Sequence, residues 1–374
     1  MSRTTMRSVV LKGLFAFAAA AVVLSAARQE VPTARFVEPA AAAPHLRLSD
    51  ESFPLPVTTP SVHAVSLVPM ASGRLLAAWF GGTREGARDV SVYLSRFDGR
   101  QWSPAEAIAT PARMSAATGH YTRKLGNPVL HVDARGLLHL FVVSVAIGGW
   151  STSYIEHAVS SDGGRSFSEA ERLRLSPFLN LSHLVRTPAL NLADGGFLLP
   201  AYFELGRKYP VAIRFDAGGR VVSRQRLPGP AHLLQPAVSV HGTDRAEAFM
   251  RDARKRRVHA CSYGGEPGGR PAGSWSPAVP IDVENPDSSV AVLPASDGGH
   301  WLACNPLLRS SRSELVLQKL DASLRKEETI VAVRAADGEF SYPALALTDD
   351  GRIHLVYTDR RKGLTHRIFE VSHE

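Results

Sequence analysis

Cysteine is scarce in this sequence, and so are long apolar stretches. Only Cys261 and Cys304 occur among the 374 residues. Both lie in strand-like segments of different repeats, so we expect two separate buried thiols rather than a disulfide. Neither has the spacing of a metal ligand, and we predict no metal site. The longest apolar run, from Gly13 to Ala27, is shorter than the ~20 residues that a membrane-spanning helix needs.

The apolar run instead has the layout of a secretory signal peptide. Basic residues, the last of them Lys12, precede it, and it ends in small residues at Ala27. We therefore expect export to the periplasm or the medium, with 1–27 either removed as a signal or kept as an N-terminal anchor. Contact with a membrane is expected only if that segment is kept. Residues 28–50, rich in Ala, Pro and charge, are expected to form a linker.

Concentrated charge is also missing. The formal net charge is +8, and the excess is diffuse apart from one cationic run at 254–257. No aromatic residues are interleaved with this run, so we predict a solvated hairpin tip there and no binding of nucleic acid. A mild positive excess remains compatible with an anionic ligand.

What the sequence does contain is a repeat. Six segments alternate apolar and small residues and reach a Gly- or Asp-containing turn ten residues after the start, and a second strand-like stretch follows each turn. Alternation with such turns is typical of β-hairpins. A long helical period is found nowhere. Repeats of this kind predict an all-β propeller with six blades, whose innermost strands converge on a central depression. The six segments begin at His63, Gly126, Arg186, Leu234, Ser288 and Ser341.

A second pattern supports the propeller. The stretch SSDGGRSF at 160–167 fits the Asp-box pattern, in which the aspartate bonds turn amides and an aromatic residue packs between blades. Degenerate copies occur at 98–102 and 264–275. We expect Asp162 to be a turn residue and not a catalytic one.

Taken together, several stretches resemble the sialidase (neuraminidase) superfamily. In particular they look like its bacterial branch of predicted-neuraminidase or exo-α-sialidase-like Asp-box (BNR repeat) propellers. The resemblance covers about 50–374 and implies a six-bladed propeller over 51–374. The matching stretches are AWFGGTREG at 78–86 with Asp89, GNP at 126–128, NPDSS at 285–289, EFSYP at 339–343, and GRIHLVYT at 351–358 followed by Arg360-Arg361.

The resemblance implies a set of site residues. Members of the superfamily use arginines for the substrate carboxylate, a loop aspartate as acid/base and a tyrosine nucleophile assisted by a glutamate. Planar guanidinium groups are the natural partners of a carboxylate. The resemblance gives Tyr342 the nucleophile's place and Asp89 that of the acid/base. Arg251 takes the place of one arginine, and either Arg312 or Arg309 takes that of another.

Some positions depart from the superfamily pattern. His63 stands where the first arginine is expected, and Gln235 stands where the assisting glutamate is expected. Because glutamine cannot accept the phenolic proton, Glu339 or Glu85 would have to replace the missing carboxylate. The amide of Asn127, on the second inner strand, is expected to point toward the site.

These residues predict an exo-acting glycoside hydrolase that removes a terminal acidic sugar, such as sialic acid, from glycans. Hydrolysis by positioned acids and bases implies no cofactor. The expected partner is an acidic glycan or sialoglycoconjugate. One alternative is a glycan-binding propeller without catalysis. A further one is a polysaccharide lyase acting on uronates with Tyr342 and His63 as acid and base. Since propellers host all three activities, the fold does not choose among them.

Overall fold

The structure is a computed structural model that describes Lys12, Gly13, Phe15 and residues 33–176, 180–254, 256–264, 273–306 and 312–372. Most of the predicted signal segment and Arg309 lie outside these residues. The chain divides into two compact units, Met1–Thr33 and Ala34–Glu374. All strands of the described ranges lie in the second unit. Among the described residues, no helix is long and apolar enough to cross a membrane.

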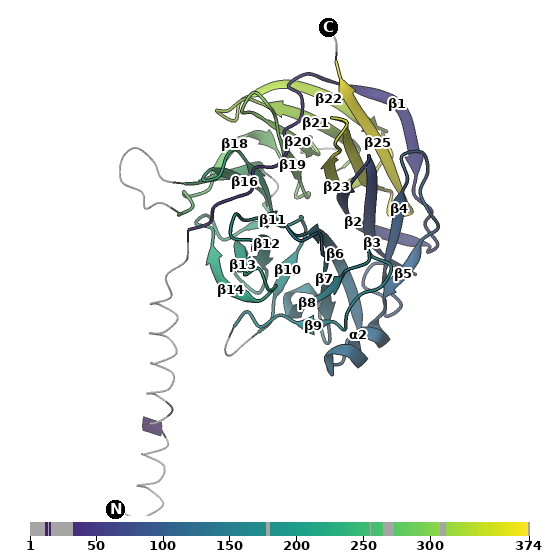
Figure 1. The fold of residues 1–374 in the computed structure, drawn as a ribbon, viewed down its shortest axis with the longest axis vertical. Helices are drawn as coiled ribbons and strands as arrows, with labels where there is room; N and C mark the ends of the chain where they lie inside the picture. The colour runs from purple at the N-terminus through teal and green to yellow at the C-terminus, as the bar shows by residue number, and fades with distance from the viewer. Residues whose placement is uncertain are drawn as a thin grey trace, which may run out of the picture. The chain divides into compact units, whose positions relative to one another are not determined.

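The strands of the described ranges form six antiparallel sheets, which are the six blades of a β-propeller (Figure 1). In five blades the strands follow chain order from the centre outward. Blade 1 contains β2 (Ser61–Met70), β3 (Arg74–Gly82), β4 (Ser91–Phe97) and β5 (Glu106–Ala109). Blade 2 contains β6 (Lys124–Val132), β7 (Leu138–Val145), β8 (Ser153–Ser160) and β9 (Glu171–Arg172). Blade 3 contains β10 (His183–Val185), β11 (Leu190–Asn191), β12 (Phe197–Phe203), β13 (Tyr209–Phe215) and β14 (Val221–Arg226).

The remaining blades follow the same plan, except that the last takes its outer strand from the beginning of the chain. Blade 4 contains β15 (Leu233–Val240), β16 (Ala246–Asp252), β17 (Arg257–Tyr263) and β18 (Val279–Glu284). Blade 5 contains β19 (Ala291–Pro294), β20 (His300–Cys304), β21 (Glu314–Leu320) and β22 (Lys326–Arg334). Blade 6 contains β23 (Phe340–Leu347), β24 (Ile353–Asp359), β25 (Gly363–Val371) and β1 (Leu46–Pro54). The predicted six-bladed all-β fold is therefore confirmed.

Burial explains why these residues form blades. Every residue of β7 is buried, as expected for a strand that is covered on both faces by neighbouring blades. The outer strand β22 alternates exposed and covered residues, which is the pattern of a strand with one face in water. Cys261 and Cys304 are both buried and are not joined in a disulfide, as predicted.

Strand β1 closes the ring. It pairs with β25, from Leu46 opposite Val371 to Pro54 opposite Thr365. Because β1 also leads directly into blade 1, the first and last blades are joined both through the backbone and through this strand pairing. Closure removes the sheet edge that an open array of blades would expose.

The chain enters the propeller earlier than the sequence indicated. Within the segment 28–50, predicted as a linker, Phe36 is fully buried and its amide donates to the carbonyl of Thr243. The carbonyl of Ala43 accepts a hydrogen bond of 2.8 Å from the buried indole of Trp301. Apolar side chains spaced between small residues are enough to pack against the blades, even though the composition resembles that of a tether.

The three Asp-box copies occupy equivalent turns. They lie between β4 and β5, between β8 and β9, and between β17 and β18, where the third strand of a blade turns into the fourth. In the second copy the Asp162 carboxylate accepts bonds from the amides of Arg165 and Ser166 and from the Ser166 hydroxyl. The prediction that Asp162 is a turn residue agrees with these bonds.

One short α-helix interrupts the strands in the described part of the chain. Helix α2 (Pro111–Thr118) is capped by the Thr110 hydroxyl and ends at Gly119, whose φ of 67° is left-handed. A cavity of about 400 Å³ lies beside α2. A second cavity, of about 410 Å³, is lined by residues from the inner segments of all six blades and by Val37, Pro39 and Ala40. It lies on the propeller axis.

Candidate active site

The inner strands carry a shared irregularity at one end. A register shift interrupts the pairing of β2, β6, β15 and β23 with their neighbours, between residues 63 and 66, 126 and 129, 234 and 237, and 341 and 344. The residue within each shift has a left-handed φ although it is not glycine. Strained backbone of this kind at one level of a fold is typical of functional sites. The four strained residues are Ala64, Asn127, Gln235 and Tyr342.

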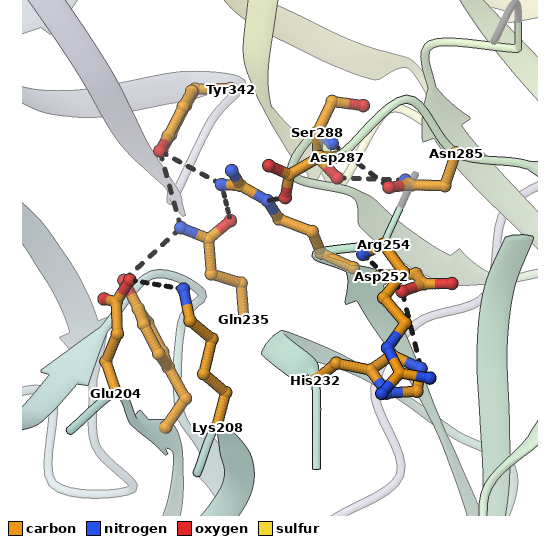
Figure 2. A network of polar contacts seen from close by, with 12 residues as sticks. Glu204, Lys208, His232, Gln235, Asp252, Arg254, Asn285, Asp287, Ser288 and Tyr342 are labelled. Atoms are coloured by element: carbon orange, nitrogen blue, oxygen red, sulfur yellow. Dashed lines mark hydrogen bonds and ion pairs between the residues drawn. The ribbon is translucent and has the colours of Figure 1, made fainter. Parts of the chain in front are cut away.

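The bulges bring Tyr342 and Gln235 together (Figure 2). Gln235 Nε2 donates to Tyr342 Oη at 3.5 Å, and Arg251 Nη1 donates to the same oxygen at 3.3 Å. Arg251 Nη1 also donates to Gln235 Oε1 at 3.0 Å. Since arginine can only donate, this bond fixes the amide with its nitrogen toward Tyr342. The phenolic oxygen therefore faces donors only, and neither neighbour can accept its proton.

A second tyrosine is linked to the same amide. Tyr202 Oη accepts bonds of 3.3 Å from both Gln235 Nε2 and Asn127 Nδ2. Burial raises the pKa of Tyr202 well above its usual value, and the neighbouring Tyr342 adds to the increase. Tyr202 therefore stays neutral, and Asn127 reaches the cluster through it.

Tyr342 has the opposite tendency. Burial, the largest single effect, opposes its ionisation, but the positive charge of Arg251, the bond from Gln235 and the charge of Arg312 together outweigh it. Arg312, whose guanidinium carbon is 5.9 Å from the ring centre, acts in the same direction. The pKa of Tyr342 is consequently lower than that of an ordinary phenol.

Acidic side chains hold two of these arginines in place. Arg251 Nε binds Asp287 Oδ1 at 2.6 Å, and Arg312 Nη1 binds Glu339 Oε1 at 3.1 Å. Arg312 Nη2 also donates to the carbonyl of Asp287 at 3.0 Å. The side chains of Arg251 and Arg312 are only 13% and 16% exposed, so both guanidinium groups are oriented and largely dry.

A third arginine enters from the turn after β24. Arg361 forms an ion pair with Glu85, and its Nε lies 3.4 Å from Glu339 Oε2. Its carbonyl accepts a bond of 2.9 Å from Val62 on β2, which ties this turn to blade 1. The two glutamates are thus engaged by arginines. In the described contacts neither of them hydrogen-bonds to Tyr342.

The fourth arginine lies beneath the tyrosine ring. Arg186 is 2% exposed, and its guanidinium carbon is 5.1 Å from the ring centre of Tyr342. It donates to the carbonyls of Val65 at 3.0 Å and Pro343 at 2.7 Å, while its Nε has no hydrogen-bond partner. No carboxylate of the described ranges pairs with it. A buried cation with neutral partners alone gives the floor of the site a positive potential.

His63 lies against the ring of Tyr342, with the two ring planes tilted by 54°. Its ring centre is 4.2 Å from that of Tyr342, and the side chain is 2% exposed. Burial lowers the pKa of His63 well below its usual value, and the positive charges around it add to the effect. The imidazole is therefore neutral at ordinary pH. The four charges are Arg361, Arg312, Arg186 and Arg251.

Asp89 stands apart from this group. Its carboxylate accepts bonds from the amide and the hydroxyl of Thr83, and the residue is exposed. The hydroxyl bond, followed by the amide bond, lowers the pKa of Asp89. The described contacts of this carboxylate are confined to its own loop.

The geometry thus joins residues from all six blades in what we call the Tyr342 cluster. Four members were not assigned from the sequence, although all lie in segments that the repeat or the resemblance singled out: Arg186, Tyr202, Asp287 and Arg361. Neither cavity is lined by Tyr342, and only the axial one touches the cluster, at Arg186. The cluster consists of Tyr342, Gln235, Tyr202, Asn127, His63, Arg186, Arg251, Asp287, Arg312, Glu339, Arg361 and Glu85.

Six blades with Asp-box turns define a sialidase-like β-propeller. The chain belongs to the BNR repeat-like domain family, whose model matches residues 73–355. No sequence among curated proteins matches it.

Solved structures share the fold over most of the chain. A Hadza microbial sialidase, Hz136, aligns with a TM-score of 0.68 at 15% identity, over 83% of this chain and 66% of that one. The intramolecular trans-sialidase of Ruminococcus gnavus aligns with a TM-score of 0.66 at 12% identity, over 84% and 95%. A protein of unknown function from Dyadobacter fermentans aligns with a TM-score of 0.68 at 14% identity, over 88% and 100%. Because the sequence identities are this low, the comparison with these structures shows a shared fold and nothing more specific.

Proposed function

We propose that this protein is an exo-acting glycoside hydrolase that releases a terminal acidic sugar, such as sialic acid, with Tyr342 as nucleophile. The observation that carries the proposal is the environment of Tyr342 Oη, which accepts bonds from Arg251 and Gln235 amid four guanidinium groups. A phenol is an adequate nucleophile only when ionised, and these donors favour the phenolate. The sialidase structures with the same fold support the acidic sugar.

The arginines also suit the substrate's own charge. A sialic acid carries a carboxylate on the carbon that is attacked, and a tyrosine nucleophile avoids bringing a second carboxylate against it. Arg251 and Arg312 are held by Asp287 and Glu339, and so are oriented before substrate binds. In this proposal they bind the substrate carboxylate, while buried Arg186 remains under the nucleophile.

The ionisation of Tyr342 is expected to depend on Arg251. Arg251→Met should raise the pKa of this phenol by roughly 1 to 2 units, because a cation in contact with the oxygen is removed, while Arg251→Lys should raise it less. The measurement is the ultraviolet absorbance of phenolate during a pH titration, corrected by the same titration of Tyr342→Phe. Identical curves for Arg251→Met and the parent would show that Arg251 does not activate the tyrosine.

Protonation of the leaving group is the weak step of this arrangement. Asp89 is exposed and has a lowered pKa, so it is ionised at neutral pH and holds no proton to give. General acids contribute about 10²- to 10⁴-fold to such reactions. We therefore expect aryl sialosides, whose phenolate leaves without help, to be cleaved at least about 100-fold faster than sialyllactose. Comparable kcat/KM values for the two substrates would contradict this expectation.

A glycan-binding protein without catalysis is the second candidate. Gln235 in place of a carboxylate and the self-contained contacts of Asp89 favour it. Incubation with a panel of acidic oligosaccharides, read by mass spectrometry, separates the candidates. Free acidic sugar supports the hydrolase, bound but intact glycan supports the lectin, and an unsaturated product would support a lyase. The predicted signal segment is consistent with this proposal, because export would bring the protein into contact with glycans outside the cytoplasm.

A further inference from the structure

Three side chains with metal-ligand chemistry meet at one end of blade 4. His232 directly precedes β15, Asp252 ends β16, and His259 lies in β17, so neighbouring strands bring them to the same level. One ligand atom from each lies within 4.8 Å of the other two. Figure 2 shows His232 and Asp252 beside one another, on the far side of the network from Tyr342.

The carboxylate of Asp252 is incompletely satisfied. Its side chain is fully buried, and Oδ1 accepts a bond of 2.7 Å from the amide of Arg254. Oδ2 is buried and has no hydrogen-bond partner in the described contacts. His232 Nε2 is 3.5 Å from Oδ1, which is at the limit of a hydrogen bond. A buried carboxylate oxygen without a partner is costly, and a bound cation would remove that cost.

The two imidazoles are arranged as ligands. His259 Nδ1 lies 3.2 Å from the carbonyl of Arg257 and therefore carries the proton that it donates there. Its Nε2 is left with a lone pair, and a histidine bonded to a carbonyl through its other nitrogen is typical of metal sites. The side chain of His232 is 14% exposed, which gives the site an opening for an ion and for water.

A comparable cluster lies across blades 4 and 5, and it too has a buried carboxylate oxygen without a hydrogen-bond partner, Glu247 Oε2. His241, Glu247 and His300 also place their ligand atoms within 4.8 Å of one another. There, however, His241 Nε2 and His300 Nδ1 lie 3.1 Å apart and bond to each other. Each of these two imidazoles has one ring nitrogen committed to the other ring, unlike those of His232 and His259, so this second cluster serves as a matched control.

We propose that His232, Asp252 and His259 bind one late first-row divalent cation, with Zn²⁺ the best fit. Two imidazole nitrogens and one carboxylate oxygen form a common zinc donor set, and water would complete a four-coordinate site. The positive charge of nearby Arg254 opposes a cation and makes the affinity modest. Since Asp252 follows Arg251 directly, the ion would hold the end of β16 that presents Arg251 to the Tyr342 cluster.

The test uses the untagged full chain, stripped of metal with a chelator. After addition of Zn²⁺ and gel filtration, elemental analysis should find about one equivalent bound per chain. Co²⁺ should give the visible absorption of a four-coordinate site, which Zn²⁺ then bleaches. His232→Gln and Asp252→Asn should each lose the equivalent and the Co²⁺ band, and His300→Gln should keep both.

Either of two results would overturn the proposal. One is a stripped parent chain that binds neither Zn²⁺ nor Co²⁺, and the other is retention of the metal by both variants at the level of the parent. If Asp252→Asn fails to fold, as judged by circular dichroism, the partly exposed His232→Gln still decides the matter. These readouts do not involve glycan cleavage, so they are independent of the proposed hydrolase activity.

Discussion

Tyr342→Phe is expected to reduce kcat for an aryl sialoside by about a thousandfold or more, which corresponds to about 4 kcal/mol of activation free energy. The substitution removes only the hydroxyl oxygen, to which Arg251 and Gln235 donate. The ring would still pack against His63 and over Arg186. Binding of a sialic acid analogue should therefore change little, and calorimetry of that analogue is the control for correct folding.

Gln235→Glu sharpens the interpretation of this result. A carboxylate there would accept the phenolic proton, and its negative charge would be offset by Arg251, which contacts Gln235 Oε1 at 3.0 Å. If turnover rises, the parent lacks a base and relies on its cations. If Tyr342→Phe keeps activity within about tenfold of the parent, Tyr342 is not the nucleophile and the proposed function fails in this form.

Acidification is expected to destabilise the propeller steeply between about pH 6.5 and pH 4. Three pairs of histidines bond through their ring nitrogens, at 2.8, 2.9 and 3.1 Å. Burial, followed by the charge of its partner, lowers the pKa of His157 to about 3 and that of His300 to about 3. The pairs are His139 with His157, His354 with His366, and His241 with His300.

The direction of the effect depends on which state binds protons first. Above about pH 6.5 a histidine is neutral in both the folded and the unfolded chain, so it adds no pH dependence. As the pH falls below 6.5, the unfolded chain is protonated while the buried imidazole is not, and stability decreases. At pH 4.5, a histidine such as His157 costs roughly 2 to 3 kcal/mol, at 1.36 kcal/mol for each pH unit.

Thermal unfolding measured from pH 7.5 to pH 4.5 tests this expectation. The unfolding midpoint should fall by more than about 10 °C over that range. His157→Gln keeps a side chain that hydrogen-bonds but does not titrate, so it should make the fall shallower. His120→Gln, at an exposed position, is the matched control and should leave the slope unchanged. A flat profile in the parent chain would contradict the effect of the buried pairs.

Part of the candidate site could be predicted because the repeat fixes it. Asn127, Gln235 and Tyr342 occupy the same position in three repeats, and a propeller places equivalent positions of its inner strands around one axis. Their convergence therefore follows from periodicity alone. Arg251 is the residue before the last in the strand paired with that of Gln235, and its place in the site has the same origin.

By itself the sequence determined the number of blades, the turns that join their strands and the side chains presented at equivalent inner positions, because these depend on local periodicity. Only the tertiary structure decided which charges surround Tyr342. Arg186 is placed under the ring and Arg361 is brought in by a turn that bonds to Val62, and both contacts join residues far apart in the chain. The closing strand β1 and buried Phe36 were hidden in the same way, because the contacts that order them lie in distant blades.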